Sequence, residues 1–278
     1  RHLQVGFVST RYQGQDVRLY AFSDVTRHIE DALALEDARR AADAANEAKT
    51  LFLATMSHEI RTPLYGVLGT LELLGLTPLD PRQKTYLHTI QRSSATLFQL
   101  ISDVLDVSKI ESGQMAIESI EFCPLDMLED TLHTYTAFAQ RKGLQLYGCI
   151  DAQLPDCVVG DPMRIRQILN NLVSNAVKFT DIGRVVIRAR AVRRGDDRVD
   201  LEWQVTDSGV GISQAQQAKL FDLFYQAPDT AGQGGAGLGL PICRWLAEMM
   251  DGQIKVVSEP GLGSSFTLKM RLPLGTSE

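Results

Sequence analysis

Long apolar runs are missing from this 278-residue chain: none approaches the roughly 20 apolar residues that cross a bilayer, and no secretory signal is present. Cysteine is scarce, with four residues, no CxxC pair and no histidine at zinc-ligand spacing. This pattern argues against a disulfide scaffold and a zinc site, and it fits a reducing compartment. An excess of positive charge is also absent, because the net charge is −6, and this argues against a general nucleic-acid-binding protein.

The residues that are present suffice for more than one globular domain. The length exceeds one average domain, and a hydrophobic content of 44% is ordinary for globular proteins. The one arginine-rich stretch, residues 184–198, alternates with Val, Ile and Ala, which predicts the solvated face of a β-hairpin rather than a binding patch. The chain begins at Arg1 rather than Met, so we expect a piece of a longer protein, with any membrane crossing upstream.

The first part of the sequence predicts a β-hairpin followed by one long helix. Residues 3–10 and 17–25 alternate apolar and polar around a turn at 13–16. From residue 27 to 74 helix-forming residues dominate, with no breaker before Pro63. Heptad spacing with small residues and one lysine predicts a weak coiled coil along Leu35, Ala38, Ala42, Ala45, Lys49, Phe52 and Met56. A single solvated helix is the alternative.

The stretch from Thr55 to Leu64 contains the candidate nucleophile. At about 100° per residue, one narrow stripe of this helix is apolar: Leu53, Met56, Ile60, Leu64, Val67, Leu71 and Leu74. His58 points roughly 160° away from that stripe, so a helix that buries the stripe presents the imidazole to solvent. Glu59 can take a proton from one ring nitrogen while the other attacks, and Thr62 lies one turn along on the same side. A solvated surface histidine is the alternative.

Proline and glycine divide this helical region. Pro63 leaves the carbonyl of residue 59 without a helical partner, which predicts a kink. Residues 75–80 end the first helix, Pro81 begins the second, and Gly113 stops it. The second helix also has one apolar stripe: Leu87, Ile90, Leu97, Ile101, Val104 and Leu105. Two antiparallel helices cannot bury both stripes well alone, so we expect a homodimer in which two copies form a four-helix bundle.

Beyond Gly113 helices are interleaved with strands that we expect to be antiparallel, which predicts an α+β sandwich with its helices on one face. The expected strands are residues 115–122, 144–150, 184–193, 198–206, 253–258 and 264–272. The expected helices are residues 124–142, 161–179, 214–224 and 238–250.

The helix expected from residue 161 has three polar side chains on one side, away from its apolar face. They are Asn171, Asn175 and Lys178. An amide oxygen is a neutral ligand for a hard cation such as Mg²⁺, and a lysine three residues away can meet phosphate charge. A merely solvated helix face is the alternative.

An acid and two glycines follow the strand expected at residues 198–206. Asp207 can accept a hydrogen bond from the exocyclic amine of adenine, and Gly209 and Gly211 allow the backbone to approach a flat ring. An ordinary glycine turn is the alternative.

A glycine-rich stretch, residues 232–240, opens another helix. Backbone N–H groups at a helix N-terminus suit a triphosphate, and the glycines before it suit a mobile lid. The stretch lacks the Lys-Ser/Thr ending of a P-loop and does not follow a strand, so neither a P-loop nor a dinucleotide-binding fold is supported.

The sequence Ser57-His58-Glu59-Ile60-Arg61-Thr62-Pro63-Leu64 resembles the phospho-acceptor box of bacterial sensor histidine kinases. The three downstream stretches, with residues 221–224 between the last two, resemble the N, G1, F and G2 boxes of the catalytic domains of that family. Those domains have the Bergerat (GHKL) ATP-binding fold. The resemblance covers about residues 48–274, and its one departure is Ala236, where Thr is common.

This resemblance implies a role for each site residue. His58 attacks the γ-phosphoryl of ATP with Glu59 as general base, and the phosphoryl then passes to an Asp of a response-regulator receiver domain, in cis or in trans. Glu59 and Thr62 also resemble the phosphatase motif of the family. Asn171 and Asn175 hold Mg²⁺, Lys178 contacts phosphate, Asp207 reads adenine, Gly209 and Gly211 line the pocket, and Gly235, Gly237, Leu238 and Gly239 cradle the phosphates.

The expected organisation is multidomain. Residues 1–28 resemble the end of a PAS-type sensor domain, 29–50 form the coiled coil, 51–114 the all-α dimerisation and phosphotransfer domain, 115–274 the ATP-binding domain, and 275–278 a tail or linker. The resemblance implies the cytoplasmic portion of a bacterial inner-membrane kinase. One alternative is a Bergerat-fold ATPase that phosphorylates no protein, which has no need of the His58 box. The other, an inactive dimerisation scaffold, is disfavoured because every box keeps its required residue type.

Overall fold

The computed structural model describes residues 2–195, 197–227 and 235–276. The chain divides into two compact units, Arg1–Met56 and Ser57–Glu278, and each is described by itself. Among the described residues, no helix combines the length and the apolar character that a bilayer crossing requires.

The first unit contains a β-hairpin and the beginning of a long helix. Strand β1 (Leu3–Tyr12) pairs antiparallel with β2 (Gln15–Asp24). Gln13 and Gly14 between them both have positive φ, which is the geometry of a type I′ turn. Helix α1 (Thr26–Gly75) follows, and its predicted heptad residues Leu35 and Phe52 are exposed. The coiled coil therefore stays a prediction.

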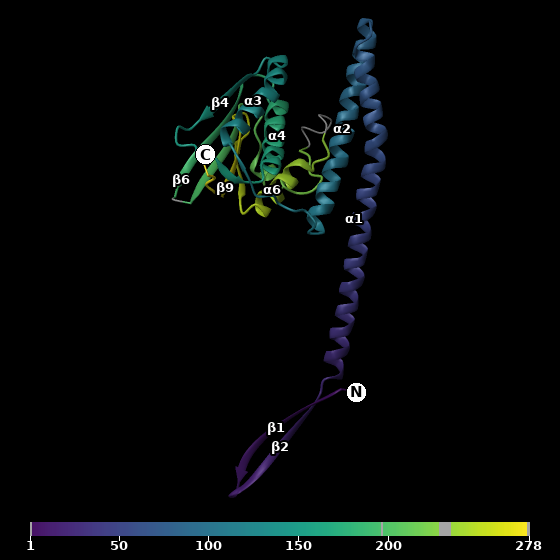
Figure 1. The fold of residues 1–278 in the computed structure, drawn as a ribbon, viewed down its shortest axis with the longest axis vertical. Helices are drawn as coiled ribbons and strands as arrows, with labels where there is room; N and C mark the ends of the chain where they lie inside the picture. The colour runs from purple at the N-terminus through teal and green to yellow at the C-terminus, as the bar shows by residue number, and fades with distance from the viewer. Residues whose placement is uncertain (1, 196, 228–234, 277–278) are drawn as a thin grey trace. The chain divides into compact units, whose positions relative to one another are not determined.

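The second unit begins with a helical hairpin made by the rest of α1 and by α2 (Pro81–Glu111) (Figure 1). α1 continues through Pro63 as one helix, so the proline does not end it. α2 begins as predicted at Pro81, behind a reciprocal capping box in which the Asp80 carboxylate accepts from the Gln83 backbone N–H. Gly113 has a φ of 67° and follows the last turn, as a helix-stopping glycine does.

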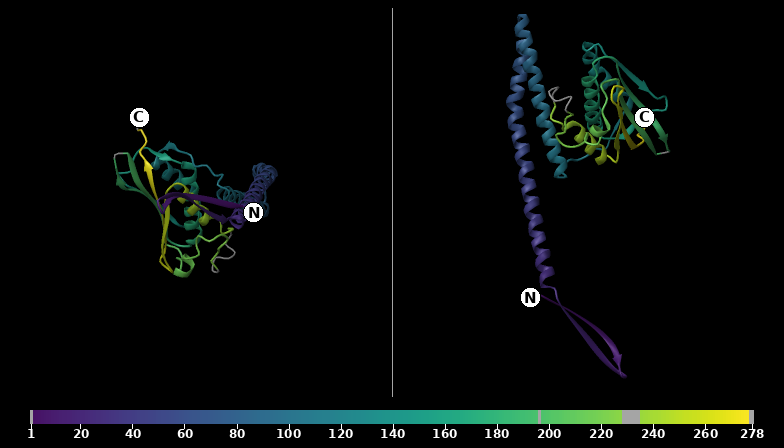
Figure 2. Two further views of the ribbon diagram at one scale, coloured as in Figure 1. Left: turned by 90° about the horizontal axis from the view of Figure 1, so that it is seen from below. Right: turned by 180° about the vertical axis from the view of Figure 1, so that it is seen from behind.

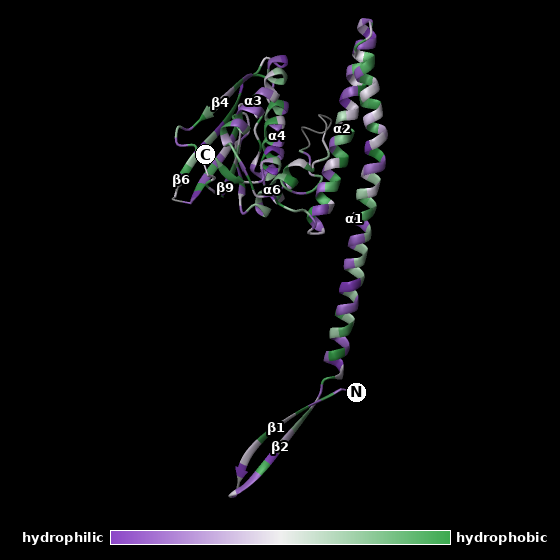
Figure 3. Ribbon diagram, viewed as in Figure 1, coloured by the Kyte–Doolittle hydropathy of each residue, from purple (hydrophilic) through white to green (hydrophobic). Residues whose placement is uncertain are grey.

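The hairpin buries only part of its apolar surface. Leu64 and Leu71 on α1 and Leu87 on α2 are buried. Figure 3 shows apolar residues along both helices, and many of the predicted stripe residues are exposed in the single chain: Met56, Ile60, Val67, Leu74, Ile90, Leu97 and Val104. The buried face of α1 is thus rotated towards Ser57, Leu64 and Leu71, and the rest of its predicted stripe lies beside that face.

The remainder of the second unit is an α+β domain. Its elements are β3 (Ile120–Phe122), α3 (Pro124–Arg141), β4 (Gln145–Ile150), β5 (Val158–Gly160), α4 (Pro162–Phe179), β6 (Arg184–Arg194), β7 (Arg198–Asp207), α5 (Gln214–Gln217), α6 (Gly239–Met249), β8 (Gln253–Glu259) and β9 (Gly263–Pro273). Five strands form one sheet in the order β4-β6-β7-β9-β8, and α3, α4 and α6 cover one face of it (Figures 1 and 2). Strands β3 and β5 form a separate two-stranded ladder.

Three expectations for this domain are wrong in detail. The sheet is mixed rather than antiparallel, because β4 pairs parallel with β6 after a crossover through α4. The strand expected at residues 115–122 is limited to β3, since its partner β5 has only three residues. The helix expected at residues 214–224 is limited to α5, and turns follow it.

Candidate functional site

His58, the predicted phospho-acceptor, lies on the exposed side of α1. Ser57, just before it, is 3% exposed, and the guanidinium of Arg61 lies 5.6 Å from the centre of the Phe98 ring on α2. Because Ser57 and Arg61 are turned inwards, His58 between them faces solvent, as the sequence predicts.

Glu59 and Thr62 accompany His58 on the exposed surface of the helix. The Thr62 hydroxyl donates a hydrogen bond of 3.1 Å to the backbone carbonyl of His58. A hydroxyl that donates in this way keeps its own lone pairs for a second donor, such as a water molecule. Thr62 is therefore placed to hold a water one turn from the imidazole.

Helix α4 brings the predicted magnesium ligands together. Asp161 caps the helix by accepting a 3.0 Å hydrogen bond from the Arg164 backbone N–H. One turn separates the two asparagines, and the Asn175 side-chain amide donates to Asn171 Oδ1 at 3.2 Å. In this arrangement Asn171 Oδ1 already accepts a hydrogen bond, whereas Asn175 Oδ1 accepts none from the described residues. Asn175 is thus the better placed cation ligand of the two.

The N-terminus of α6 lies against the same part of α4. A Cβ on Gly239 would lie 2.1 Å from Asn171 Nδ2, so only glycine permits this approach. Leu238, the N-cap of α6, is buried and provides no capping side chain. Among the described residues, no side chain caps the first N–H groups of α6, and uncapped N–H groups at a helix N-terminus are suited to bind phosphate.

The described glycines before α6, Gly235 and Gly237, lie close to neighbouring segments. Gly237 has a φ of 69°, and its carbonyl accepts a 3.0 Å hydrogen bond from the Phe224 backbone N–H. A Cβ on Gly235 would lie 3.8 Å from Lys178 Nζ, so the stretch passes close to the predicted phosphate ligand. The predicted lid residues Gly232, Gln233 and Gly234 lie outside the described residues.

Asp207 is buried at the end of β7, where its Oδ1 accepts hydrogen bonds from the backbone N–H groups of Gly209 (2.8 Å) and Ser264 (3.3 Å). Burial raises the pKa of this carboxyl, and the two hydrogen bonds oppose that rise. Both hydrogen bonds to described residues use Oδ1, so Oδ2 is available to a ligand such as the amine of adenine.

Thr180 is a site residue that the sequence reasoning missed. It is fully buried, and its hydroxyl has no hydrogen-bond partner among the described residues. A Cβ on Gly209 would lie 3.0 Å from this hydroxyl and 2.9 Å from Asp207 Oδ1, so the hydroxyl lies beside the carboxylate. A buried polar atom without a partner is costly, and this hydroxyl has almost no exposed surface that a ligand could contact directly.

Lys142 stabilises the end of α4 that leads to Thr180. Its ammonium donates to the carbonyls of Val177, Lys178 and Thr180 at 2.9, 2.8 and 2.9 Å. These carbonyls are at the C-terminal end of the helix, where a cation is favourable. Desolvation lowers the pKa of the neighbouring Lys178, whose Nζ lies 4.5 Å from the centre of the Phe179 ring.

Gly211 has a packing role in the described structure. Its φ is 71°, and a Cβ there would lie 2.0 Å from the carbonyl oxygen of Glu259. This glycine lets the loop after β7 approach the β8–β9 turn, where the Gly261 backbone N–H donates to the carbonyl of Val210 at 2.7 Å. The role predicted from the resemblance, lining the pocket, stays a prediction.

The α+β domain also contacts α2 directly. Gln167 Nε2 on α4 donates to Asp106 Oδ2 at 2.7 Å, and the Arg164 guanidinium lies 3.9 Å from Asp106 Oδ1. Asp103, one turn earlier on α2, is buried, which raises the pKa of its carboxyl. These contacts join α4 to the helical hairpin.

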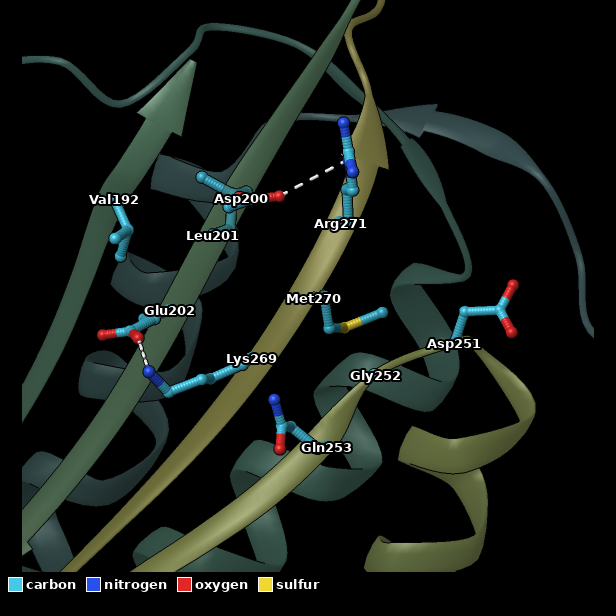
Figure 4. A pocket seen from close by; sticks show the side chains of 10 residues that line it. All are labelled: Val192, Asp200, Leu201, Glu202, Asp251, Gly252, Gln253, Lys269, Met270 and Arg271. Carbon is cyan, nitrogen blue, oxygen red and sulfur yellow. Dashed lines mark ion pairs between the residues drawn. The ribbon is translucent and has the colours of Figure 1, made fainter. Parts of the chain in front are cut away.

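A depression of about 330 Å³ at β7, β8 and β9 contains none of the predicted site residues (Figure 4). Two of its acids are paired with cations: Glu202 with Lys269, and Asp200 with Arg271. Both cations among the residues that line the depression, Lys269 and Arg271, are therefore paired with acids, which leaves no free cation there for a triphosphate.

The residues around Asp207 and α6 fit an adenine nucleotide: an unpaired buried hydroxyl, a buried carboxylate oxygen, an uncapped helix N-terminus and a lysine. Across the described ranges, no three His, Cys, Asp or Glu side chains come together as a metal site. A magnesium ion here would therefore depend on asparagine oxygen and on the phosphates themselves.

Comparison with known proteins identifies two domain families in this chain. Residues 48–113 match the His Kinase A (phospho-acceptor) domain, and residues 160–274 match the histidine kinase-, DNA gyrase B-, and HSP90-like ATPase family. The sensor histidine kinase RcsC of Salmonella typhimurium is 42% identical over 275 residues, which are 98% of this chain and 28% of that protein. The sensor histidine kinase GacS of Pseudomonas protegens is 43% identical over 91% of this chain and 28% of its own length.

Among solved structures, the crystal structure of full-length ShkA in complex with AMPPNP is similar, with a TM-score of 0.67 and 32% identity. The similarity covers 81% of this chain and 46% of that one. The chain thus spans less than a third of these two curated relatives. With a phospho-acceptor region followed by a gyrase B- and HSP90-like ATPase domain, the chain belongs to the histidine kinases.

Proposed function

We propose that this chain is the core of a sensor histidine kinase that phosphorylates His58 from ATP and passes the phosphoryl group to an Asp of a receiver domain. One observation carries the proposal. An exposed histidine, flanked by inward-facing Ser57 and Arg61, occurs in the same chain as a nucleotide cradle made by Asp207, Thr180 and the α6 N-terminus.

In this proposal, different residues of the cradle bind the adenine and the phosphates of the nucleotide. Asp207 Oδ2 binds the exocyclic amine of adenine, and the buried Thr180 hydroxyl lies behind it beside the carboxylate. The α6 N–H groups and Lys178 bind the phosphates. Mg²⁺ would be held by Asn175, with Asn171 orienting its amide, and would neutralise phosphate charge.

His58 supplies the nucleophile. One imidazole nitrogen attacks the γ-phosphorus, the bond to the β-phosphate oxygen breaks, and ADP leaves. Glu59 takes the proton from the other ring nitrogen. Little further chemistry is needed, because phosphoryl transfer depends mainly on positioning and charge neutralisation.

The partners follow from the exposed surfaces and from the relatives. The apolar residues left exposed on α1 and α2 support a homodimer in which two hairpins form a four-helix bundle. The hybrid histidine kinase named among the relatives, from Dictyostelium discoideum, supports a receiver domain in cis or in trans. Thr62, with its hydroxyl one turn from the imidazole, supports an additional phosphatase activity towards that receiver. The chain would act on the cytoplasmic side of a bacterial inner membrane, as part of a longer sensor kinase.

A phosphoryl-bond assay tests the proposal against its rivals. The protein is incubated with γ-labelled ATP, and the labelled product is exposed to acid and to base. We expect label that acid removes and base does not, as a phosphoramidate requires. ATP hydrolysis without protein label would favour an ATPase that phosphorylates no protein. An absence of both would favour an inactive scaffold.

A further inference from the structure

Two of the four cysteines flank the same end of the β3–β5 ladder, because Cys123 directly follows β3 and Cys157 directly precedes β5. The antiparallel pairs of that ladder are Ile120 with Gly160, Glu121 with Val159 and Phe122 with Val158. One further step in the same register pairs Cys123 with Cys157. Cys123 still has an extended backbone, with φ −92° and ψ 118°, so the register can continue to it.

We propose that Cys123 and Cys157 are a redox-sensitive pair that forms a reversible disulfide. Directly opposed residues of an antiparallel pair have Cα atoms about 4.5–5.5 Å apart, whichever hydrogen-bonding class the pair belongs to. That range lies inside the ~4.4–6.8 Å that disulfides require. Both thiols are free and partly exposed, so a small oxidant can reach them.

The surroundings assign different roles to the two thiols. Desolvation, with Glu121 and Cys123 nearby, raises the pKa of the Cys157 thiol. Gly275 covers Cys157 on one side: its backbone N–H donates to the Cys157 carbonyl at 3.0 Å, and a Cβ at Gly275 would lie 2.3 Å from the sulfur. Cys123 is therefore the attacking thiol, and Cys157 is the thiol that resolves the intermediate.

The oxidant is a small-molecule disulfide of the glutathione type. The Cys123 thiolate attacks one of its sulfurs and releases one glutathione thiolate, which leaves a mixed disulfide on Cys123. The Cys157 thiolate then attacks the Cys123 sulfur and releases the second glutathione thiolate. Two electrons pass from the protein to glutathione, and the two protons of the protein thiols go to the released thiolates. Reduced glutathione reverses both steps.

The disulfide would stabilise the contacts that β3 and β5 make with residues 274–276, which follow β9. Leu274 bridges to Val158, and Thr276 donates from its backbone N–H and its hydroxyl to the Glu121 carboxylate at 3.0 and 2.9 Å. The β3–β5 ladder has only three residue pairs, so its opening is cheap without a crosslink. A disulfide between Cys123 and Cys157, at one end of the ladder, prevents that opening and lowers the entropy of the unfolded chain.

Mapping the disulfide in the whole protein tests this assignment. The chain is equilibrated in glutathione buffers from fully reduced to fully oxidised, its free thiols are alkylated, and its peptides are mapped without reduction by mass spectrometry. We expect a linked pair of peptides containing Cys123 and Cys157, reversed by reduced glutathione. Cys149→Ser, the matched control, should leave the link intact, and Cys123→Ser should remove it.

Thermal unfolding provides an independent readout. Oxidation should raise the Tm of the unmodified chain and of Cys149→Ser by roughly 3–8 °C. It should leave the Tm of Cys123→Ser unchanged, because that variant cannot form the disulfide. Three outcomes would overturn the proposal: both thiols remain free in oxidised buffer, only mixed disulfides with glutathione form, or the link joins two chains.

Discussion

The ATP-binding domain and the helical hairpin differ in how completely one chain buries their apolar side chains. In the ATP-binding domain Trp203, Leu246 and Leu268 have no exposed surface at all. In the hairpin Val67 is 45% exposed and Leu97 is 46% exposed, although both lie on predicted apolar stripes. The domain that binds nucleotide therefore forms a complete core alone, whereas the hairpin that presents His58 requires a second copy.

The same division separates the two halves of the proposed reaction. Nucleotide binding depends on side chains held by the complete core, and phosphoryl acceptance depends on a residue of the incomplete one. Substitutions in one region should therefore leave the other half of the reaction intact.

The largest expected effects come from substituting one side chain needed for phosphoryl acceptance and one needed for nucleotide binding. His58→Gln should abolish phosphoryl incorporation and leave ATP binding unchanged, since His58 is exposed on α1. Asp207→Asn should weaken ATP binding by roughly 100-fold, because the carboxylate that accepts from adenine becomes an amide and a buried partner is lost. Titration calorimetry measures binding, and labelled ATP measures transfer. Normal labelling of His58→Gln would exclude His58 as acceptor.

The incomplete core of the hairpin gives the second prediction. Val67→Glu should dissociate the dimer, because a carboxylate buried between four helices is expensive. Leu169→Ala, in the fully buried face of α4, should lower the free energy of unfolding by about 2–5 kcal/mol without changing the oligomeric state.

Light scattering after size-exclusion chromatography measures the mass of the oligomer, and chemical denaturation measures the free energy of unfolding. Ile182→Glu, at a position that is 88% exposed in the ATP-binding domain, is the matched control for the added charge and should change neither. A dimer that survives Val67→Glu would show that this stripe faces solvent in both copies.

Local sequence signals were sufficient for most of the helices and for most of the sheet, but not for the helix expected at residues 214–224. Pro81 and Gly113 define α2, because a proline at the first position and a glycine of positive φ act within one turn of the helix. The β5 strand escaped notice because three residues are too few for an alternating pattern. The parallel pairing of β4 with β6 depends on the path of the intervening helix, which no local pattern records.

The same distinction applies to the site. Asn171, Asn175 and Asp207 were predicted because each occurs in a local pattern of residues. Thr180 and Lys142 were not, since their roles arise from contacts between distant segments: the Lys142 ammonium reaches carbonyls 35 to 38 residues away. A buried hydroxyl without a partner becomes visible only in three dimensions.

Lys142 gives the third prediction. Lys142→Met should lower the free energy of unfolding by about 1–3 kcal/mol, because three carbonyls at the end of α4 lose a charged donor. ATP affinity should fall with it, since the same carbonyls position the segment before Thr180. Lys255→Met, an exposed lysine on β8, is the control and should alter neither quantity. Unchanged stability of Lys142→Met would show that solvent replaces the ammonium without cost.

Substitution of Thr62 gives the smallest expected effect. It separates two activities that both depend on the helical hairpin, and nucleotide binding is not involved. The hydroxyl donates to the His58 carbonyl and can hold a water with its lone pairs, but transfer from ATP needs no such water. Thr62→Ala should therefore keep autophosphorylation and slow dephosphorylation of a phosphorylated receiver domain by roughly tenfold, which corresponds to about 1.4 kcal/mol in the barrier. Thr62→Ser keeps the hydroxyl and should retain most of the dephosphorylation rate. The two rates are measured separately, one from labelled ATP and the other from receiver that is already phosphorylated. If Thr62→Ala slows both rates equally, Thr62 acts through the helix backbone at His58, and no water held by its hydroxyl is needed.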